Sequence, residues 1–330
     1  MFKKYNSIEN AYRKDFIERV ALATIKSNDF VVQEKVHGAN FSLITNGVDL
    51  KSAKRTSLLE DTDHFNNHAL IKELYYEKIL KLYKAVKTKY PNTESITVFG
   101  EIFGGCYPDI EQARGAIKVQ KGIFYAPYNE FYAFDIMVNQ AFYLNVTETN
   151  ELLETYGFFY AKTLFRGTLK EALAYPNAFE SKISEWLKLP EIKNNTCEGI
   201  VIKPVVPHFL PNGSRVIIKN KNAKWSEKSK ANSKPLVKVE LSNEVQNLLS
   251  ELERYINSNR LANVMSKESN LDSTQIGKLI GLLSKDALED FLKEFKTPFD
   301  TLEKSEQKQI TKQLNQFAAQ LVRQELLQIN

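Results

Sequence analysis

Hydrophobic residues in the first two thirds of the chain occur in short runs separated by turn residues. The runs have the β-branched and aromatic enrichment of strands. They are FVVQEKVHGANFSLIT (30–45), SITVFGEIF (95–103), EFYAFDIMV (130–138), CEGIVIKPVV (197–206) and SRVIIKNK (214–221). Apolar residues with helical spacing lie between some of them, as over 68–88. This pattern predicts an α+β domain built on antiparallel or mixed sheets.

The pattern changes at Leu241, where leucine, glutamine, lysine and glutamate follow one another at helical spacing. The stretch from Ser226 to Pro235 is polar and ends in a proline, as linkers often do. A chain of 330 residues is long enough for two domains. We therefore expect a larger domain over 1–225, a basic linker over 226–240 and a small all-α domain over 241–330.

Composition places the chain among ordinary globular proteins, since 43% of its residues are hydrophobic and 26% are charged. No run approaches the roughly 20 apolar residues that a membrane-spanning helix needs, and the first residues show no secretory signal. We expect an intracellular, cytoplasmic monomer with no membrane partner, located in the host cytoplasm if the protein is viral.

Positive charge is concentrated near the expected linker. The net charge is +5, and the excess is densest from Arg215 to Lys238. The cations there are Arg215, Lys219, Lys221, Lys224, Lys228, Lys230, Lys234 and Lys238, with Glu227 as the single acid. Such a segment attracts a polyanion or forms a solvated loop, and both interpretations stay open.

Lys35 is the first residue with a chemical pattern around it. It lies in EKVHGAN, at the end of an apolar run and three residues before Gly38. A lysine flanked by other cations can lose its proton more easily and become a nucleophile near neutral pH. By itself the pattern is more typical of a lysine at an exposed strand end.

An ordered series of polar residues follows Lys35 and strengthens the functional interpretation. The series is Lys54 and Arg55 in SAKRT, Glu101 in VFGEIF, Phe134 and Asp135 in FYAFDI, Glu198 and Lys203 in EGIVIKP, and Lys219 and Lys221 in VIIKNK. Phosphoryl transfer needs cations around the phosphates and carboxylates for a divalent metal. Taken singly, each residue is better explained as a rim carboxylate, a core aromatic or a solvated strand end. The ordered combination indicates nucleotidyl transfer.

These motifs resemble motifs I, III, IIIa, IV and V of the covalent nucleotidyltransferase superfamily of ligases and capping enzymes. Within it, EKVHGANFSL resembles the RNA ligase 2 type, which includes phage double-stranded RNA ligases and kinetoplastid editing ligases. DNA ligases and capping enzymes usually have aspartate at the position of His37. The resemblance extends to NRLANVMSK and GLLSKDAL near the carboxyl end, and weakens over 104–130 and 160–195.

The resemblance implies a nucleotidyltransferase (adenylyltransferase) domain followed by a small all-α domain, and a role for each motif residue. Lys35 would be the nucleophile that becomes lysyl-AMP, and His37 would act in later steps. Phe134 would stack on adenine. The other implied nucleotide-binding residues are Glu34, Asn40, Arg55, Glu101, Lys203, Lys219 and Lys221. Glu101 and Glu198 would bind a divalent metal, Lys54 and Asp135 would support the site, and Arg260 and Asp286 would contact the RNA ends.

The implied activity is ATP-dependent joining of 3′-hydroxyl and 5′-phosphate RNA ends, in RNA repair, through lysyl-AMP and an adenylylated 5′ end. The expected substrate is a nick in duplex RNA or an RNA/DNA hybrid, with ATP and Mg²⁺ as cofactors and Mn²⁺ as a substitute. The alternatives are a DNA ligase or a GTP-using capping guanylyltransferase, but these usually carry a β-rich OB domain where this chain has helical spacing. An inactive nucleic-acid-binding relative would be expected to lack Lys35 or the lysines of VIIKNK, and all are present.

Overall fold

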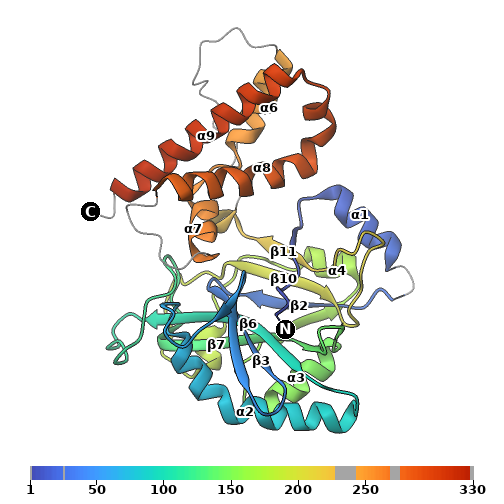
Figure 1. The fold of residues 1–330 in the computed structure, drawn as a ribbon, viewed down its shortest axis with the longest axis vertical. Coiled ribbons are helices and arrows are strands. Elements are labelled where there is room, and N and C mark those ends of the chain that lie inside the picture. Colours follow the sequence, from blue (N-terminus) through green and yellow to red (C-terminus); the bar gives the residue numbers. More distant parts are fainter. Residues whose placement is uncertain (1, 25–26, 227–242, 268–275, 328–330) are drawn as a thin grey trace. The chain divides into compact units, whose positions relative to one another are not determined.

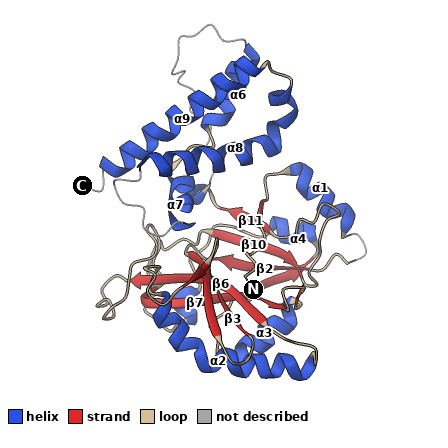
Figure 2. Ribbon diagram, in the orientation of Figure 1, coloured by secondary structure: helices blue, strands red, loops and turns tan. Residues whose placement is uncertain are grey.

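The structure is a computed structural model that describes residues 2–24, 27–226, 243–267 and 276–327. It divides into two compact units, Met1–Lys224 and Trp225–Asn330. Both sheets lie in the first unit, and the described residues of the second unit are mainly helical (Figures 1 and 2). The predicted α+β class with a helical carboxy-terminal region is confirmed. Of the predicted linker, only Ser226 falls within the described residues.

The five-stranded sheet of the first unit is mixed. In spatial order its strands are β1 (Glu9–Asn10), β11 (Ile218–Lys221), β10 (Gly199–Pro204), β2 (Phe30–Lys35) and β9 (Thr163–Gly167). β1 pairs with β11 in parallel, and the other neighbours pair antiparallel. Because β2 has a paired strand on each side, the backbone that leads to Lys35 is fixed by hydrogen bonds along both edges.

The six-stranded sheet is antiparallel throughout. In spatial order its strands are β5 (Leu58–Leu59), β4 (Leu50–Lys54), β3 (Ala39–Thr45), β6 (Ile96–Cys106), β7 (Ala126–Val138) and β8 (Phe142–Tyr143). The chain leaves the first sheet after Lys35 and enters the second at Ala39. Gly38 lies in this connection, where a Cβ atom would come within 2.4 Å of the carbonyl oxygen of Ile102. Glycine is therefore the residue that lets the connection pass this close to β6.

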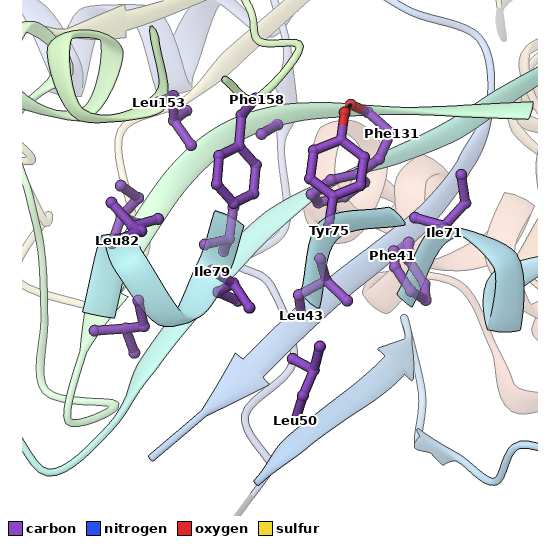
Figure 3. Packing of buried hydrophobic residues seen from close by; sticks show 14 of the residues in the cluster. Phe41, Leu43, Leu50, Ile71, Tyr75, Ile79, Leu82, Phe131, Leu153 and Phe158 are labelled. Carbon is purple, nitrogen blue, oxygen red and sulfur yellow. Dashed lines mark hydrogen bonds between the residues drawn. The ribbon is translucent and has the colours of Figure 1, made fainter. Parts of the chain in front are cut away.

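Helices cover the outer face of each sheet. α2 (His68–Lys89) and α3 (Val146–Thr155) cover the six-stranded sheet, and α1 (Lys14–Ala23) and α4 (Leu169–Ala174) cover the five-stranded sheet. α2 buries a stripe of residues three to four apart against strand residues such as Phe41 and Phe131 (Figure 3). That stripe consists of Ile71, Tyr75, Ile79, Leu82 and Val86. The short helix α5 (Ile183–Trp186) follows α4 along the chain.

The inner faces of the two sheets meet at the centre of the first unit. Successive side chains of a strand point to opposite faces, so the strand residues opposite the α1 and α4 cluster face inward. Phe99 and Met137 of the six-stranded sheet pack with Val201 and Ile217 in one buried cluster. Helices cover the outer faces of both sheets, so the polar motif residues that point inward lie between the two sheets.

The second unit consists of α6 (Asn243–Glu253), α7 (Ser258–Lys267), α8 (Ile276–Asp300) and α9 (Lys304–Leu327). α8 contains Pro298 and is interrupted at Phe295, where the backbone leaves helical geometry at φ −115° and ψ 22°. Proline removes a backbone donor and clashes with the carbonyl of the preceding turn, which accounts for the kink. No described helix is long and apolar enough to cross a membrane.

Leu82→Ala should lower the stability of the protein much more than Leu74→Ala. Both residues lie on α2, but Leu82 is 0% exposed in the core cluster and Leu74 is 52% exposed. Truncating a buried leucine costs about 2–5 kcal/mol, whereas an exposed change is within about 0.5 kcal/mol. Urea unfolding followed by circular dichroism measures both, and equal midpoints for the two variants would contradict the packing described.

Candidate active site

Lys35 is the last residue of β2 and lies beside a buried carboxylate. Its Nζ is 2.8 Å from Oε2 of Glu198, whose side chain is 0% exposed. Glu198 directly precedes Gly199, and Gly199 is paired with Lys35 across the strands. Gly199 has φ +149°, and a Cβ atom there would come within 2.3 Å of the carbonyl oxygen of Asn220. This glycine lets the chain approach β11 closely while it positions Glu198.

A second lysine holds the other oxygen of the same carboxylate. Lys221 Nζ is 2.7 Å from Oε1 of Glu198. Lys221 pairs with Gly199 from the opposite side of β10, so two lysines reach Glu198 from the two strands that flank it. Lys219, two residues earlier on β11, points to the same face of the sheet. The structure thus brings Lys35, Glu198, Lys219 and Lys221 together, and the shared face of Lys219 and Lys221 is the one predicted from their spacing.

The two lysines keep Glu198 ionised. Burial by itself would raise the pKa of this carboxyl, but the charges of Lys221 and Lys35 outweigh burial and hold its pKa at about 2. A buried carboxylate with cations on both oxygens is a fixed anchor for those cations. The amino groups of two strands are thereby held where an anionic phosphate could meet them.

His37 and Glu101 complete the group. The backbone N–H of His37 donates to the hydroxyl of Tyr125 at 3.0 Å, and His37 Nδ1 lies 3.8 Å from Glu198 Oε2. Burial lowers the pKa of His37, so the imidazole is neutral at pH 7. Glu101 on β6 lies against the Gly38 connection, and burial raises its pKa against the opposing effect of Lys35.

Of Asn40, Lys54 and Arg55, the structure places Asn40 beside this group on the six-stranded sheet. Asn40 is paired directly with Glu101 and shares its inner face. Lys54 ends β4 opposite Phe41, the neighbour of Asn40. Arg55 follows Lys54 in the bend that connects β4 to β5.

A second buried charge cluster is centred on Asp135. Arg215 donates to both carboxylate oxygens at 2.9 and 3.1 Å, Lys203 Nζ donates to Oδ1 at 3.0 Å, and the hydroxyl of Tyr5 donates to Oδ2. Burial would raise the pKa of Asp135, but Arg215 and Lys203 outweigh it and set the pKa at about 2. The predicted residues therefore separate into two clusters, and Lys203 belongs to the Asp135 cluster.

The basic segment that begins at Arg215 is more than a solvated loop. The side chains of Arg215 and Lys221 are 3% and 6% exposed, and each is bound to a buried carboxylate. For these two residues the solvated interpretation is wrong. Lys228, Lys230, Lys234 and Lys238 lie outside the described residues.

Phe134 lies at an irregularity of β7. In the pairing with β6, Phe99 faces Asp135 and Gly100 faces Ala133, so Phe134 is the extra residue of a bulge. A bulge redirects the side chain that it contains. The ring of Phe134 packs beside that of Tyr5, with the centroids 5.0 Å apart. Its predicted stacking on adenine stays a prediction.

Glu34 points to the other face of β2 from Lys35. Its carboxylate accepts hydrogen bonds from the hydroxyl of Ser181 at 2.6 Å and the backbone N–H of Lys182 at 2.8 Å. Burial raises the pKa of Glu34 to about 7. The carboxylate thus fastens the segment before α5 to β2, and its predicted contact with a nucleotide stays a prediction.

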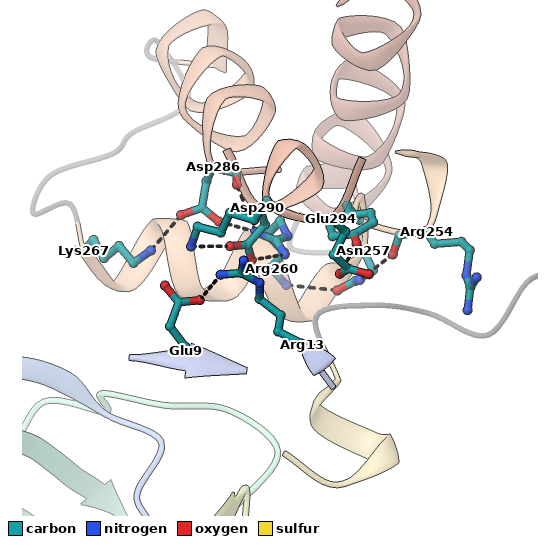
Figure 4. Close-up of polar contacts among 11 residues, drawn as sticks. Glu9, Arg13, Arg254, Asn257, Arg260, Lys267, Asp286, Asp290 and Glu294 are labelled. Atoms are coloured by element: carbon teal, nitrogen blue, oxygen red, sulfur yellow. Dashed lines mark hydrogen bonds and ion pairs between the residues drawn. The ribbon is translucent and has the colours of Figure 1, made fainter. Parts of the chain in front are cut away.

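In the second unit, Arg260 and Asp286 bind each other (Figure 4). Arg260 on α7 donates to Oδ2 of Asp286 at 2.6 Å and to Oδ2 of Asp290 at 2.8 Å. Lys267 Nζ lies 2.9 Å from the other oxygen of Asp286. These ion pairs connect α7 with α8, and contact of Arg260 and Asp286 with RNA ends stays a prediction.

Three residues of these clusters were missed by sequence reasoning as site residues. Tyr5 and Tyr125 are tyrosines without a surrounding motif, and Arg215 stood out only as one member of a basic run. The packing of Arg215 on the ring of Tyr143, 3.6 Å from the centroid, joins segments far apart in sequence. A single sequence carries no local signal for such contacts.

The Lys35 cluster can bind an anionic phosphate and present an amino nucleophile to it. Among the described residues, no group of three or more histidine, cysteine or acidic side chains could hold a metal ion. Mg²⁺ in phosphoryl-transfer sites usually takes one or two carboxylates and completes its ligands with substrate phosphates and water. Glu101 and Glu198 fit that mode of binding.

The native protein should lose stability as pH rises from about 4.5 to 7, and Glu34→Gln should abolish this loss. The unfolded chain ionises Glu34 near the ordinary pKa of 4.5, whereas the folded chain keeps the proton up to about 7. The unfolded state then binds fewer protons in this window, so stability falls with rising pH, by on the order of 3 kcal/mol.

Urea unfolding at several pH values tests this, with the exposed Glu180→Gln as the control. An unchanged pH profile in Glu34→Gln would show that Glu34 is ionised in the folded protein throughout the window.

Two protein families match this chain. The family described as RNA ligase matches residues 28–221, and the family described as T4 RNA ligase 2 C-terminal matches residues 238–320. The first range contains the whole Lys35 cluster. The second range begins shortly before α6 and ends within α9.

The chain is also similar to curated proteins. RNA-editing ligase 2, mitochondrial, of Trypanosoma brucei brucei (strain 927/4 GUTat10.1) is 27% identical over 231 residues, which cover 62% of this chain and 55% of the relative. RNA-editing ligase 1, mitochondrial, of Trypanosoma brucei brucei is 26% identical over 226 residues, covering 57% and 47%. This chain thus spans about half the length of the curated relatives it matches.

A mutant of Naegleria gruberi RNA ligase with ATP and Mn is 19% identical, with a TM-score of 0.44 and coverage of 68% of this chain and 57% of that one. The same ligase with pyrophosphate has a TM-score of 0.45 at 17% identity, with the same coverage. The predicted resemblance to the RNA ligase 2 type is confirmed by the two family matches. Because the first match covers more than half of its length, the chain belongs to the RNA ligase family.

Proposed function

We propose that this protein is an ATP-dependent RNA ligase that carries AMP on Lys35 during the reaction. The observation that supports this most directly is the position of the Lys35 amino group, 2.8 Å from Glu198 and close to Lys221 and His37. An amino nucleophile surrounded by phosphate-binding cations suits attack on a nucleotide. Membership in the RNA ligase family points to RNA ends as the second substrate.

In the first step, Lys35 Nζ attacks the α-phosphorus of ATP. A phosphorus–nitrogen bond forms, the bond to the bridging oxygen breaks, and pyrophosphate leaves. Lys221 and Lys219 lie on the same face and would offset the charge of the phosphates. When bound at Glu101 and Glu198, Mg²⁺ would offset phosphate charge and compete with Lys35 for the carboxylate of Glu198.

The ion pair with Glu198 defines the resting state of the nucleophile. It holds the amino group in place beside the buried carboxylate. The attack requires the free amine, so Lys35 has to release its proton when the nucleotide enters. Neutral His37, 3.8 Å from Glu198, adds no positive charge at pH 7 and can accept a proton during the reaction.

In the following steps, AMP passes from Lys35 to a 5′-phosphate end, and a 3′-hydroxyl then displaces AMP to form the phosphodiester. We propose nicks in duplex RNA or RNA/DNA hybrid as the preferred substrate. Such recognition would rest on A-form shape and 2′-hydroxyl contacts. A role in RNA repair, a cytoplasmic location and a monomeric state stay predictions from the sequence.

Incubation with Mg²⁺ and α-labelled ATP should leave acid-stable label on the denatured protein. Lys35→Ala and Lys35→Arg should both abolish the label. Arginine retains a cation beside Glu198 but cannot replace the lysine amine as nucleophile. A parallel incubation with labelled GTP distinguishes an ATP-using ligase from a capping guanylyltransferase.

Lys51→Ala is the matched control, because Lys51 is an exposed lysine on β4 away from the Glu198 pairs. It should retain the label of the native protein. Label that persists in both Lys35 variants would overturn the assignment of the nucleophile, and no label from either nucleotide would favour an inactive binding relative.

Sealing of a nicked duplex should depend on the sugar at the 3′ side of the nick. A strand that ends in ribose should be joined faster than the same strand ending in deoxyribose, because 2′-hydroxyl contacts help to align the reacting end. Gel analysis of end-labelled strands measures both rates. Equal rates with an all-DNA nick would instead favour the DNA ligase alternative.

A further inference from the structure

The helix α9 carries a regular row of long polar side chains that turns gradually around the helix axis. Its members are exposed and follow one another at intervals of four residues: Lys304, Lys308, Lys312, Gln316, Gln320 and Gln324. A second row, also at intervals of four but offset by two, is buried in the second unit: Ile310, Leu314, Ala318 and Val322. An offset of two residues turns a helix by about 200°. At each level of the helix, the lysine and glutamine row therefore points away from the neighbouring residues of the apolar row.

All six residues of this row line one groove of about 1390 Å³ within the second unit. We call it the α9 groove. Leu288 and Phe299 of α8 contribute apolar surface to it, and Thr311 and Asn315 add further polar groups. Successive members of the row are about 6 Å apart along the helix axis, because four residues of an α-helix rise by that distance. The groove is therefore long compared with its single lysine-to-lysine step. The groove is thus an elongated surface with lysines at one end and amides at the other.

The α9 groove is positively charged. Three lysines line it, and no carboxylate is among its lining residues. The described acids of α9 have partners elsewhere: Glu306 accepts the backbone N–H of Glu303, and Glu325 accepts the hydroxyl of Ser258. An elongated groove with this charge fits an extended anion better than a neutral or cationic ligand.

We infer that the α9 groove binds the phosphodiester backbone of the RNA substrate, an inference that rests on the proposed function. A strand of a duplex presents a phosphate about every 3.4 Å of helix axis, so lysines about 6 Å apart can each meet a different phosphate. The amide groups beyond them donate and accept hydrogen bonds, as a 2′-hydroxyl does. The groove would add RNA affinity without reading base sequence.

The test uses the full chain with Lys304, Lys308 and Lys312 all changed to glutamine. Glutamine has a helix propensity close to that of lysine and continues the row already present. Binding of a fluorescently labelled nicked RNA duplex is titrated at several salt concentrations. The matched control changes three exposed lysines outside the groove, Lys81, Lys84 and Lys285, to glutamine and removes the same charge.

The groove variant should bind RNA on the order of tenfold more weakly or worse at low salt, and its slope of log affinity against log salt should shrink by about 3. The control variant should change both quantities much less. The single variant Lys308→Gln should lower the slope by about 1, which keeps the test informative if the triple variant folds poorly.

Lysyl-AMP formation without RNA is measured on the same samples and should be equal in all variants. Absence of label in the native protein would count against the proposed function, while the binding data would still decide the role of the groove. Native-like RNA binding by the groove variant, or an equal loss in the control, would overturn the inference. Native-like binding would favour an acidic protein segment as the occupant instead.

Discussion

The pairing of β10 with β2 on one side and β11 on the other decides where the cations of the candidate active site lie. Gly199 is paired with Lys35 and with Lys221, and Glu198 precedes it directly. Two lysines from different strands therefore meet the two oxygens of one buried carboxylate. A shift of one residue in either pairing would turn a lysine to the outer face, where Val32 and Ile202 are buried. The apolar core of the outer face thus fixes the register, and the register places the charges.

The two charge clusters of the first unit each keep a buried carboxylate ionised, and both do so with two cations. Glu198 and Asp135 are both buried, and each is ionised because two cations outweigh the effect of burial on its pKa. A buried carboxylate with one partner removed would be left partly uncompensated, which is strongly destabilising. The two clusters differ in where their cations lie along the chain. Asp135 and its partners join distant segments of the chain, whereas Lys35 also stands at the strand end where the connection to β3 begins.

Sequence patterns were sufficient for the strands that carry the motifs, because β-branched runs bounded by turn residues coincide with β2, β3, β6, β7, β10 and β11. They also predicted that Lys219 and Lys221 share a face, since this requires only the alternation of a strand. They could not assign Lys203 to Asp135 or find Arg215 and Tyr5, because these contacts depend on how strands far apart in sequence pair. Glu34 shows the same limit: its position beside Lys35 in sequence places its side chain on the opposite face.

The connection from Lys35 to Ala39 has a consequence for protein synthesis. It joins the two sheets through four peptide bonds, and Gly38 lies against Ile102 of β6. The Lys35 cluster, however, also needs Glu198 and Lys221, which are translated much later. A nascent chain that has emerged only as far as β7 contains Lys35 but neither of the groups that hold its amino group. Lys35 therefore gains its complete environment only after the last strand of the unit has left the ribosome and paired.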